Sequence, residues 1–305
     1  MYTPDPQTLN DQFAIVDHIA FTASRGDLPV AQIRNAHAAA TVAVQGGHVS
    51  AFQPHGHAPV LWVSDHSLYA PGKAIRGGIP VCWPWFGPHP TDPHKPSHGF
   101  VRTAMWDVVA TGSTADGATQ IQLSIGDSAA TRAMWPYAFR LEIAITVGAR
   151  LDVELIAHNI GDTTFTCGGA LHSYFHVSDV TAIAIHGLDG CTYIDQLDPL
   201  EPKVQRGPIT IDSETDRIYL DTTATCVIDD PGLQRRIQIA KAGSRSTVVW
   251  NPWIAKAQRL PDFGAQEYLG MVCVETSNAN RDTVRIPPGG AHRLRAIMGV
   301  EPAVP

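Results

Sequence analysis

Short runs in which apolar and polar residues alternate restrict the fold of this 305-residue chain more than any other feature. Every second residue from Phe139 to Val147 is apolar, so these side chains lie on one face of a half-buried β-strand. Residues 151–156 repeat the pattern. The 26 glycines and 23 prolines are spread along the chain and separate such runs, as turn residues do. The sequence therefore predicts a large antiparallel β-sandwich.

Other apolar runs predict further strands, and helical periodicity is weak throughout. Strands are expected at residues 41–44, 48–52, 60–63, 105–109, 120–125, 225–229, 237–241, 247–250, 270–276 and 292–299. Only a turn or two of helix is expected, near residues 128–135 and 262–268. No linker or repeat marks a boundary, so we expect a single domain over residues 1–305, with residues 1–12 as a loose N-terminal extension.

The charge balance and the cysteines limit the partners and the compartment. Lys and Arg number 22 and Asp and Glu number 29, a formal net charge of -7, whereas nucleic-acid or anionic-membrane binding needs a basic face. No apolar run approaches the ~20 residues of a membrane span, and the N-terminus lacks the pattern of a secretory signal. The five cysteines are scattered and form no C-x-x-C, so we expect reduced thiols and a cytoplasmic protein.

Two stretches combine arginine with residues that suit a sugar or a phosphate. Arg76 precedes two glycines, which let a backbone approach a ligand, and the aromatic residues within 83–86 can stack on a sugar face. A Gly/Pro-rich turn over a buried Trp cluster remains an alternative interpretation. His98 and Arg102 lie four residues apart, and the planar fork of arginine donates two hydrogen bonds to a phosphate. An isolated surface arginine is usually just solvated, which is the alternative interpretation.

Several histidines have spacings that resemble metal sites, but none has a convincing set of partners. His172 and His176 lie four residues apart, yet their aromatic neighbours favour a strand, and no metalloprotease-type Glu lies between them. The pair His55 and His57 and the loop of residues 89–98 lack an obvious carboxylate or Cys complement. The sequence therefore predicts no metal site.

Two acidic residues remain as candidates for chemistry. Glu275 ends an apolar run, where burial in a cleft would raise the pKa of its carboxyl toward a value useful for a general base. A strand-end carboxylate at the surface is the alternative. Asp195, within Tyr193–Gln196, has the character of an ordinary loop acid by residue type alone.

Taken together, five segments resemble the aldose 1-epimerase (galactose mutarotase-like) superfamily, and most closely its hexose-6-phosphate branch, the glucose-6-phosphate 1-epimerases. The matching segments are KAIRGGIPVCWPWFG (73–87), HGFVRTAMWDV (98–108), LHSYFHVSD (171–179), YIDQ (193–196) and VWNPWIAKAQRLPDFGAQEYLGMVCVETSNA (249–279). The resemblance covers roughly residues 30–300, and the last segment is long enough to be specific.

The resemblance implies a galactose mutarotase-like β-supersandwich that uses neither a metal nor an organic cofactor. It also assigns roles to six residues: His172 and Glu275 match the catalytic pair, Arg76 and Arg102 match basic residues near the substrate phosphate, and His98 and Asp195 match positions lining the sugar site. Two departures affect this assignment. Gln196 stands where the family often has Lys, and residues 94–97 differ from the more usual Leu-Pro-x, which leaves the loop geometry and the sugar preference open.

The function implied is a cofactor-independent interconversion of the α and β anomers of a hexose 6-phosphate by a monomeric isomerase. Glu275 would take the proton of the C1 hydroxyl while protonated His172 donates to the ring oxygen, and the roles reverse on closure from the other face. Arg76 and Arg102 would hold the phosphate. The alternatives are a mutarotase for unphosphorylated aldoses, a non-catalytic sugar-phosphate-binding protein and a metal-dependent carbohydrate enzyme.

Overall fold

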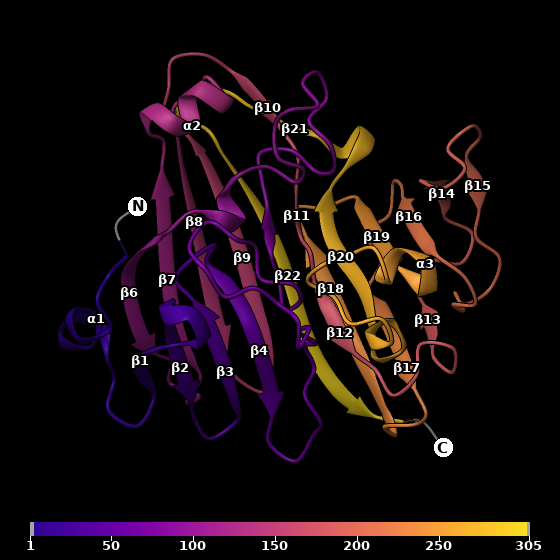
Figure 1. Ribbon diagram of the computed structural model, residues 1–305, viewed down its shortest axis with the longest axis horizontal. Coiled ribbons are helices and arrows are strands. Elements are labelled where there is room, and N and C mark those ends of the chain that lie inside the picture. The colour runs from indigo at the N-terminus through magenta and orange to yellow at the C-terminus, as the bar shows by residue number, and fades with distance from the viewer. Residues whose placement is uncertain (1–2, 304–305) are drawn as a thin grey trace.

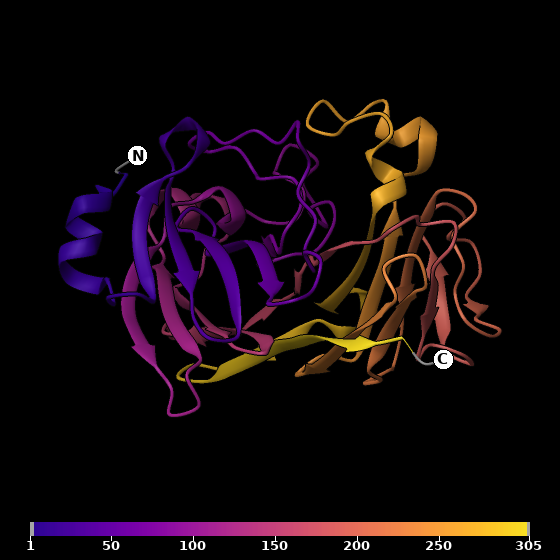
Figure 2. The same ribbon diagram turned by 90° about the horizontal axis from the view of Figure 1, so that it is seen from below.

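Two large antiparallel sheets form most of the computed structural model, which describes residues 3–303 (Figure 1). The first eight-stranded sheet has the order β13-β17-β18-β22-β9-β8-β7-β6. Its strands are β6 (Asp107–Ser113), β7 (Thr119–Gly126), β8 (Phe139–Val147), β9 (Arg150–Asn159), β13 (Ala184–His186), β17 (Cys226–Asp230), β18 (Arg235–Ala242) and β22 (Ala291–Pro302). The long strand β22 runs along the base of both halves of the molecule and pairs with β9 and β18 (Figure 2).

The second eight-stranded sheet contains parts of the segments whose sequences resemble the aldose 1-epimerase superfamily. Its order is β15-β14-β16-β19-β20-β11-β5, and β12 also pairs with β20. The strands are β5 (Val81–Cys82), β11 (Gly169–Leu171), β12 (Tyr174–His176), β14 (Thr192–Asp195), β15 (Lys203–Val204), β16 (Thr215–Tyr219), β19 (Ser246–Asn251) and β20 (Met271–Asn278).

Smaller elements complete the structure. A four-stranded sheet contains β1 (Ile19–Ala23), β2 (Pro29–Arg34), β3 (Ala38–Ala43) and β4 (His48–Pro54), and a two-stranded sheet pairs β10 (Phe165–Cys167) with β21 (Val284–Ile286). The helices are α1 (Pro6–Phe13), α2 (Ala129–Met134) and α3 (Trp253–Ala257), with 3-10 turns η1 (Arg25–Asp27), η2 (Val101–Thr103), η3 (Glu267–Gly270) and η4 (Asn280–Asp282).

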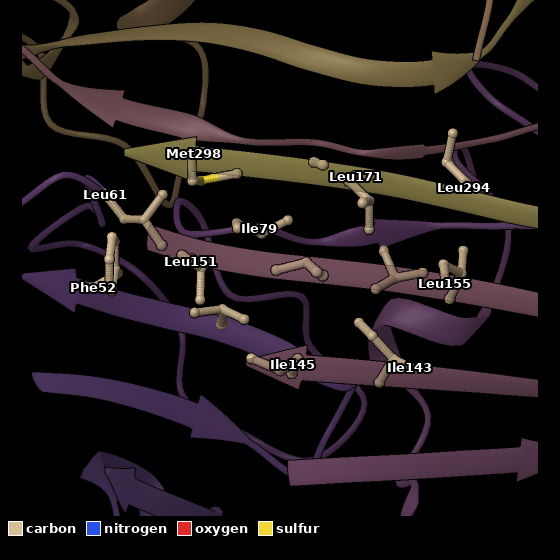
Figure 3. Close-up of a cluster of buried hydrophobic side chains, with 14 of the residues drawn as sticks. Phe52, Leu61, Ile79, Ile143, Ile145, Leu151, Leu155, Leu171, Leu294 and Met298 are labelled. Atoms are coloured by element: carbon tan, nitrogen blue, oxygen red, sulfur yellow. The ribbon is translucent and has the colours of Figure 1, made fainter. Parts of the chain in front are cut away.

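The main core lies between the β8-β9-β22 face and the segments that cover it. In Figure 3, Ile143, Leu155 and Met298 from this sheet face Phe52 of β4 and Leu171 of β11. All five side chains are almost fully buried, and burial of such a side chain contributes roughly 1.5–3 kcal/mol. The buried and less buried residues of β8 alternate along the strand, as its sequence predicts. The predicted all-β antiparallel sandwich is therefore confirmed.

Three local predictions have different outcomes. The helix near residues 128–135 is confirmed as α2, capped by the Ser128 side chain, whereas in residues 262–268 a 3-10 turn begins only at Glu267. The expectation of a loose end over residues 1–12 is wrong where residues 6–12 form most of α1, because Asp5 caps this helix and Leu9 is buried. Residues 60–63 contribute isolated bridges rather than a regular strand. A single domain over residues 1–305 stays a prediction.

Strand β20 is buried on both faces, and its pleat divides its side chains between two environments. Val272 and Val274 join the main core, whereas Met271 and Cys273 join a second cluster that is covered by the α3 segment. Successive residues of a strand point to opposite faces, so Glu275 shares the face of Cys273. The carboxyl group is therefore directed to the side of the sheet on which α3 lies.

Asn251 holds the α3 segment against this face. Its amide donates to the carbonyl oxygens of Tyr268 and Met271, both at 2.9 Å, and its side-chain oxygen accepts from the Trp253 backbone N–H at 2.9 Å. The side chain is fully buried, so it satisfies three backbone groups that water does not reach. One side chain thus joins the ends of β19 and η3 to the start of α3.

We predict that Asn251→Ala lowers the free energy of unfolding by about 3 kcal/mol, because it leaves these buried backbone groups without partners. Equilibrium urea denaturation measures the change. Gln258→Ala, at an exposed position of the same segment, is the matched control and should shift stability by less than about 0.5 kcal/mol. Equal stability of both variants would contradict the bracing role of Asn251.

His48 of β4 lies beneath the backbone that follows Arg76. Gly78 has φ +62°, and a Cβ there would lie 2.5 Å from His48 Nε2, so only glycine fits above the ring. Burial, with a smaller contribution from the Arg102 charge, lowers the pKa of His48 to about 4. The imidazole is therefore neutral in the folded protein at physiological pH.

The unfolded chain binds a proton at this position below pH 6.5, whereas the folded chain does so only below about pH 4. His48 therefore reduces stability as the pH falls through this window, by about 3 kcal/mol in total. We predict that His48→Gln flattens the decrease in unfolding free energy between pH 6.5 and pH 4, while His66→Gln at an exposed position does not. Parallel stability curves for wild type and His48→Gln would show that this prediction is wrong.

Candidate active site

An open cavity of about 230 Å³ lies over the β16-β19-β20 face. Loop residues between 76 and 98 form one side, and the α3 segment forms another. In Figure 2 these two segments lie on the same side of the sheet. The lining residues are Arg76, Phe86, Gly87, Pro88, Ser97, His98, His172, Tyr174, Gln196, Asp216, Val248, Trp250, Lys256, Leu260 and Glu275. The cavity thus combines aromatic surface with acid, base and cationic groups.

His172 and Glu275 meet in this cavity, although they are 103 positions apart in the sequence. His172 Nε2 lies 3.4 Å from Glu275 Oε1. Glu275 is placed by β20, opposite Val248 of β19, and His172 lies between β11 and β12, where its backbone N–H donates to the Pro80 carbonyl at 3.0 Å. Both side chains are buried, at 8% and 1% residue exposure.

Each member of the pair also has a buried polar atom without a hydrogen-bond partner among residues 3–303, namely His172 Nδ1 and Glu275 Oε2. Burial lowers the pKa of His172 well below its usual value, and the neighbouring His98, Arg102 and Arg76 lower it further. Burial raises the pKa of Glu275 well above its usual value, Asp216 adds to this effect, and Arg102 opposes it. Both groups therefore favour their neutral forms in this structure, and between them they hold one proton.

Arg76 is held rigidly at the cavity wall. Its guanidinium donates to Tyr174 Oη at 3.2 Å and to Asp262 Oδ1 at 3.1 Å, and its Nε is buried without a partner in the described part of the chain. Burial opposes the charge, but Tyr174 and Asp262 overcome this effect and raise the pKa of Arg76 above its usual value. Arg76 is therefore a cation at all relevant pH values.

His98 also lines the cavity, on the side of His172. Its ring lies 5.6 Å from the His172 ring and 4.9 Å from the Phe86 ring, centroid to centroid. The residue has φ +66°, and its Nδ1 accepts from the Gly87 backbone N–H at 3.3 Å. Burial and the charges of Arg102 and Arg76 lower the pKa of His98 to about 3, so this ring is a neutral hydrogen-bonding group.

Arg102 does not line the cavity. Its Nη2 donates to the Ser97 carbonyl at 2.9 Å, at the base of the loop that carries His98. Its charge nevertheless reaches the site, because it lowers the pKa of His98, His172 and Glu275. In this structure Arg102 supports the loop and contributes electrostatic potential, rather than meeting Arg76 directly.

Asp195 does not line the cavity either, in contrast to the sequence-based expectation. Asp195 of β14 lies opposite Arg217 of β16. The residue before Arg217, Asp216, lies opposite Trp250 of β19, and both Asp216 and Trp250 line the cavity. Alternation along the strands therefore directs Asp195 to the face opposite Asp216. The Asp195 carboxylate accepts from Lys203 Nζ at 3.1 Å, and its neighbour Gln196 lines the cavity instead.

Three further residues that the sequence did not identify also line the cavity: Asp216, Lys256 and Trp250. Lys256 Nζ lies 3.0 Å from Glu214 Oε1, 3.7 Å from Asp216 Oδ2 and 5.8 Å from the centre of the Trp250 ring. Burial raises the pKa of Asp216, an effect that Lys256 opposes. A signal for Asp216 was present in the sequence, since it is an acidic residue beside the β-like residues 217–219.

None of the helices within residues 3–303 has the length and apolar character needed to cross a bilayer.

Comparison with known proteins identifies relatives of this chain. The chain is 37% identical over 251 residues to a Salmonella typhimurium protein named "putative glucose-6-phosphate 1-epimerase", a match that spans 82% of this chain and 83% of that protein. An Escherichia coli protein with the same name is 35% identical over 259 residues, which span 85% of this chain and 86% of that protein.

The fold is shared with a crystal structure described as "a putative mutarotase (YeaD)" from Salmonella typhimurium. The two structures have a TM-score of 0.89 and 32% sequence identity, and the match covers 95% of this chain and 96% of the other. The family model for aldose 1-epimerase matches residues 29–298, which include every residue of the cavity. The chain therefore belongs to the aldose 1-epimerase family and is an isomerase with a galactose mutarotase-like fold.

Proposed function

We propose that this isomerase interconverts the α and β anomers of a hexose 6-phosphate, as a glucose-6-phosphate 1-epimerase. The observation that carries the proposal is the 3.4 Å approach of His172 Nε2 to Glu275 Oε1 at the wall of an open cavity. Anomer exchange requires one group that removes the C1 hydroxyl proton and another that protonates the ring oxygen. The names of the Salmonella and Escherichia coli relatives support the same substrate class.

The pair performs the reaction by exchanging the single proton that it holds. In the form that acts on the ring, the Glu275 carboxylate accepts the proton of the C1 hydroxyl while the His172 imidazolium donates to the ring oxygen. The C1–O5 bond breaks as the C1 carbonyl forms, so the open-chain aldehyde can rotate about C1–C2. Closure from the other face returns the proton to the new C1 oxygen, and each group recovers its starting state.

The neutral pair that burial favours and this ionised pair contain the same number of protons. Transfer of one proton across the 3.4 Å between His172 and Glu275 converts one form into the other without exchange with solvent. The sugar stabilises the ionised form, because its C1 hydroxyl hydrogen-bonds to the carboxylate and its ring oxygen accepts from the imidazolium. Burial makes these interactions stronger than they would be in water.

The aromatic floor and the polar groups of the cavity hold the sugar ring. Trp250 lines the cavity next to His172, with ring centroids 6.2 Å apart, and an indole face of this kind stacks on the C–H face of a pyranose. Tyr174 instead packs between the rings of His172 and Trp62, so it supports the imidazole from behind. Asp216 and Gln196 supply acceptors and donors for the sugar hydroxyls. Asp216 lies two strands from Glu275, roughly 10 Å across the sheet, which is comparable to the length of a hexose 6-phosphate.

Arg76 is the cation that we assign to the phosphate, because it lines the cavity and 23% of its side chain is exposed. Lys256 is a second cation, on the side of the cavity formed by the α3 segment, and Arg102 adds longer-range potential. Charge-assisted hydrogen bonds to a phosphate contribute about 1.5–3 kcal/mol each. A phosphate held in this way fixes the far end of the substrate while C1 turns.

A mutarotase for unphosphorylated aldoses is the second candidate, and the ion pairs of the cavity favour it. Arg76 already pairs with Asp262, and Lys256 is flanked by Glu214 and Asp216. A phosphate must therefore compete with carboxylates for both cations, whereas a neutral sugar need not. Comparing the anomer exchange of glucose 6-phosphate with that of glucose by NMR separates the two candidates, and equal rates would remove the phosphate assignment.

We predict that Glu275→Gln and His172→Asn each lower the turnover of anomer exchange by roughly 10²–10⁴-fold, because each removes a group that transfers a proton. Glu201→Gln, at an exposed position, is the control and should retain full activity. NMR exchange spectroscopy with glucose 6-phosphate measures the rates, and titration calorimetry checks that sugar binding persists. Undiminished exchange in both variants would identify a protein that does not use this pair, and an inactive wild type would identify a binding protein.

We also predict that Arg76→Met lowers kcat/KM for glucose 6-phosphate by roughly 10–100-fold and changes that for glucose by less than threefold, because only the phosphorylated substrate loses a charge-assisted hydrogen bond to the guanidinium. Asp262→Asn should have the opposite effect on the phosphorylated substrate, since it releases Arg76 from its carboxylate partner. Arg285→Met, an exposed arginine outside the cavity, is the control. An equal loss for both substrates in Arg76→Met would assign Arg76 to the sugar instead.

A further inference from the structure

The acid–base pair has a third neighbour that the proposed reaction does not use. Cys273 lies on the same face of β20 as Glu275, two residues before it. Donor atoms of His172, Cys273 and Glu275 all lie within 4.8 Å of one another, and all three side chains are buried. Among residues 3–303, no other group of three His, Cys, Asp or Glu side chains has this geometry.

The spacing of these donors is close to that around a tetrahedral metal ion. Zinc binds imidazole nitrogen and carboxylate oxygen at about 2.0 Å, which places two such donors ~3.3 Å apart. The measured separation of His172 Nε2 and Glu275 Oε1 is 3.4 Å. A zinc–sulfur distance of ~2.3 Å places the thiolate ~3.6 Å from the other donors, so Cys273 Sγ must move by no more than roughly 1 Å.

Two buried polar atoms of the pair lack the hydrogen bonds that a purely structural contact would provide. Glu275 Oε2 and His172 Nδ1 are buried and have no partner in the part of the chain that the structure describes, which is costly for a polar atom. A purely structural pair would normally satisfy such atoms with hydrogen bonds. Neither atom has accessible surface in the open cavity, but a cation bound beside Glu275 Oε1 would satisfy the Glu275 carboxylate from within the protein.

The charges of the three groups also suit a divalent cation. A metal-bound cysteine is a thiolate and a metal-bound glutamate is a carboxylate, so a divalent cation with this Cys, Glu and neutral His forms a neutral complex in a buried place. Both cations that line the cavity already have carboxylate partners, Arg76 with Asp262 at 3.1 Å and Lys256 with Glu214 at 3.0 Å. The open cavity leaves a fourth position for water or for an oxygen of the sugar.

We propose that His172, Cys273 and Glu275 form a binding site for a soft or borderline divalent cation, with Zn²⁺ as the reference ion, and that occupation of this site inhibits the isomerase. The thiolate ligand selects zinc and related ions over Mg²⁺ and Ca²⁺, which prefer oxygen donors. The ion blocks the reaction because it takes the imidazole nitrogen and the carboxylate that would otherwise transfer the proton.

Metal binding is tested directly on the full-length protein, without reference to catalysis. Co²⁺ added to the reduced, metal-free wild type should bind one ion per chain and give visible d–d bands of a tetrahedral site together with a near-ultraviolet thiolate charge-transfer band. Zn²⁺ should displace it, and a 100-fold excess of Mg²⁺ should not. Cys273→Ser and Cys273→Ala should both lose the charge-transfer band, while Cys226→Ala, a buried cysteine of the other large sheet, should keep it.

The absence of a thiolate band in the wild type would overturn the site, and so would its persistence in both Cys273 variants. The wild-type spectrum decides the question even if a variant fails to fold. Circular dichroism of each variant shows whether a lost band reflects a lost ligand.

The inhibitory consequence rests on the proposed epimerase function and has its own measurement. Zn²⁺ at micromolar concentration should lower the rate of anomer exchange of the wild type at least tenfold, and a chelator should restore it. Cys273→Ala should keep its basal rate and require at least tenfold more Zn²⁺ for half inhibition. Equal sensitivity of both proteins would overturn the inhibition, whereas an inactive wild type that still gives the Co²⁺ spectrum would refute the epimerase function and leave the metal site standing.

Discussion

Burial of Glu275 on a strand covered from both sides is the constraint on which the rest of the site depends. A carboxyl group in such a place favours its protonated form, because ionisation without solvent is expensive. The same burial keeps His172 neutral. In water at mildly acidic pH, the carboxyl group and the imidazole would each be charged. In the protein they form a pair that shares one proton, and a reversible proton exchange with a sugar requires such a pair. The architecture creates this property by enclosing β20 between the main core and the α3 cluster.

The cations of the cavity are organised differently from the acid–base pair. Arg76 and Lys256 are both paired with carboxylates, Arg76 with Asp262 and Lys256 with Glu214 and Asp216. These pairs hold the long side chains in place and reduce their net charge. When a phosphorylated substrate binds, its phosphate must replace a carboxylate as the partner of Arg76 or Lys256. The affinity therefore depends on whether the cation binds the phosphate more strongly than it binds the carboxylate. The net charge of -7 has little bearing on this local balance.

The sequence-based assignments of the site agree with the structure to different degrees, and the differences have a common cause. His172, Glu275, Arg76 and His98 all line the cavity, as the resemblance implied. Asp195 lies in a short motif, and its direction depends on the register of β14 against β16, which local sequence does not specify. The register directs Asp195 away and brings Gln196 and Asp216 into the cavity instead. The contacts of Arg102 depend on the fold of the 88–98 loop, which periodicity does not describe.

Local sequence was sufficient for the all-β class, for the alternating strand β8 and for the turn of helix at α2, because strand pleating and helix capping act between residues close in the chain. It was not sufficient for the meeting of His172 with Glu275, for the role of Asn251 as a brace or for the place of Cys273 beside the pair. These relations join segments up to about a hundred residues apart. They arise from strand order, register and the packing of α3 on the sheet, all of which are set by the burial of the whole chain rather than by any one segment of it.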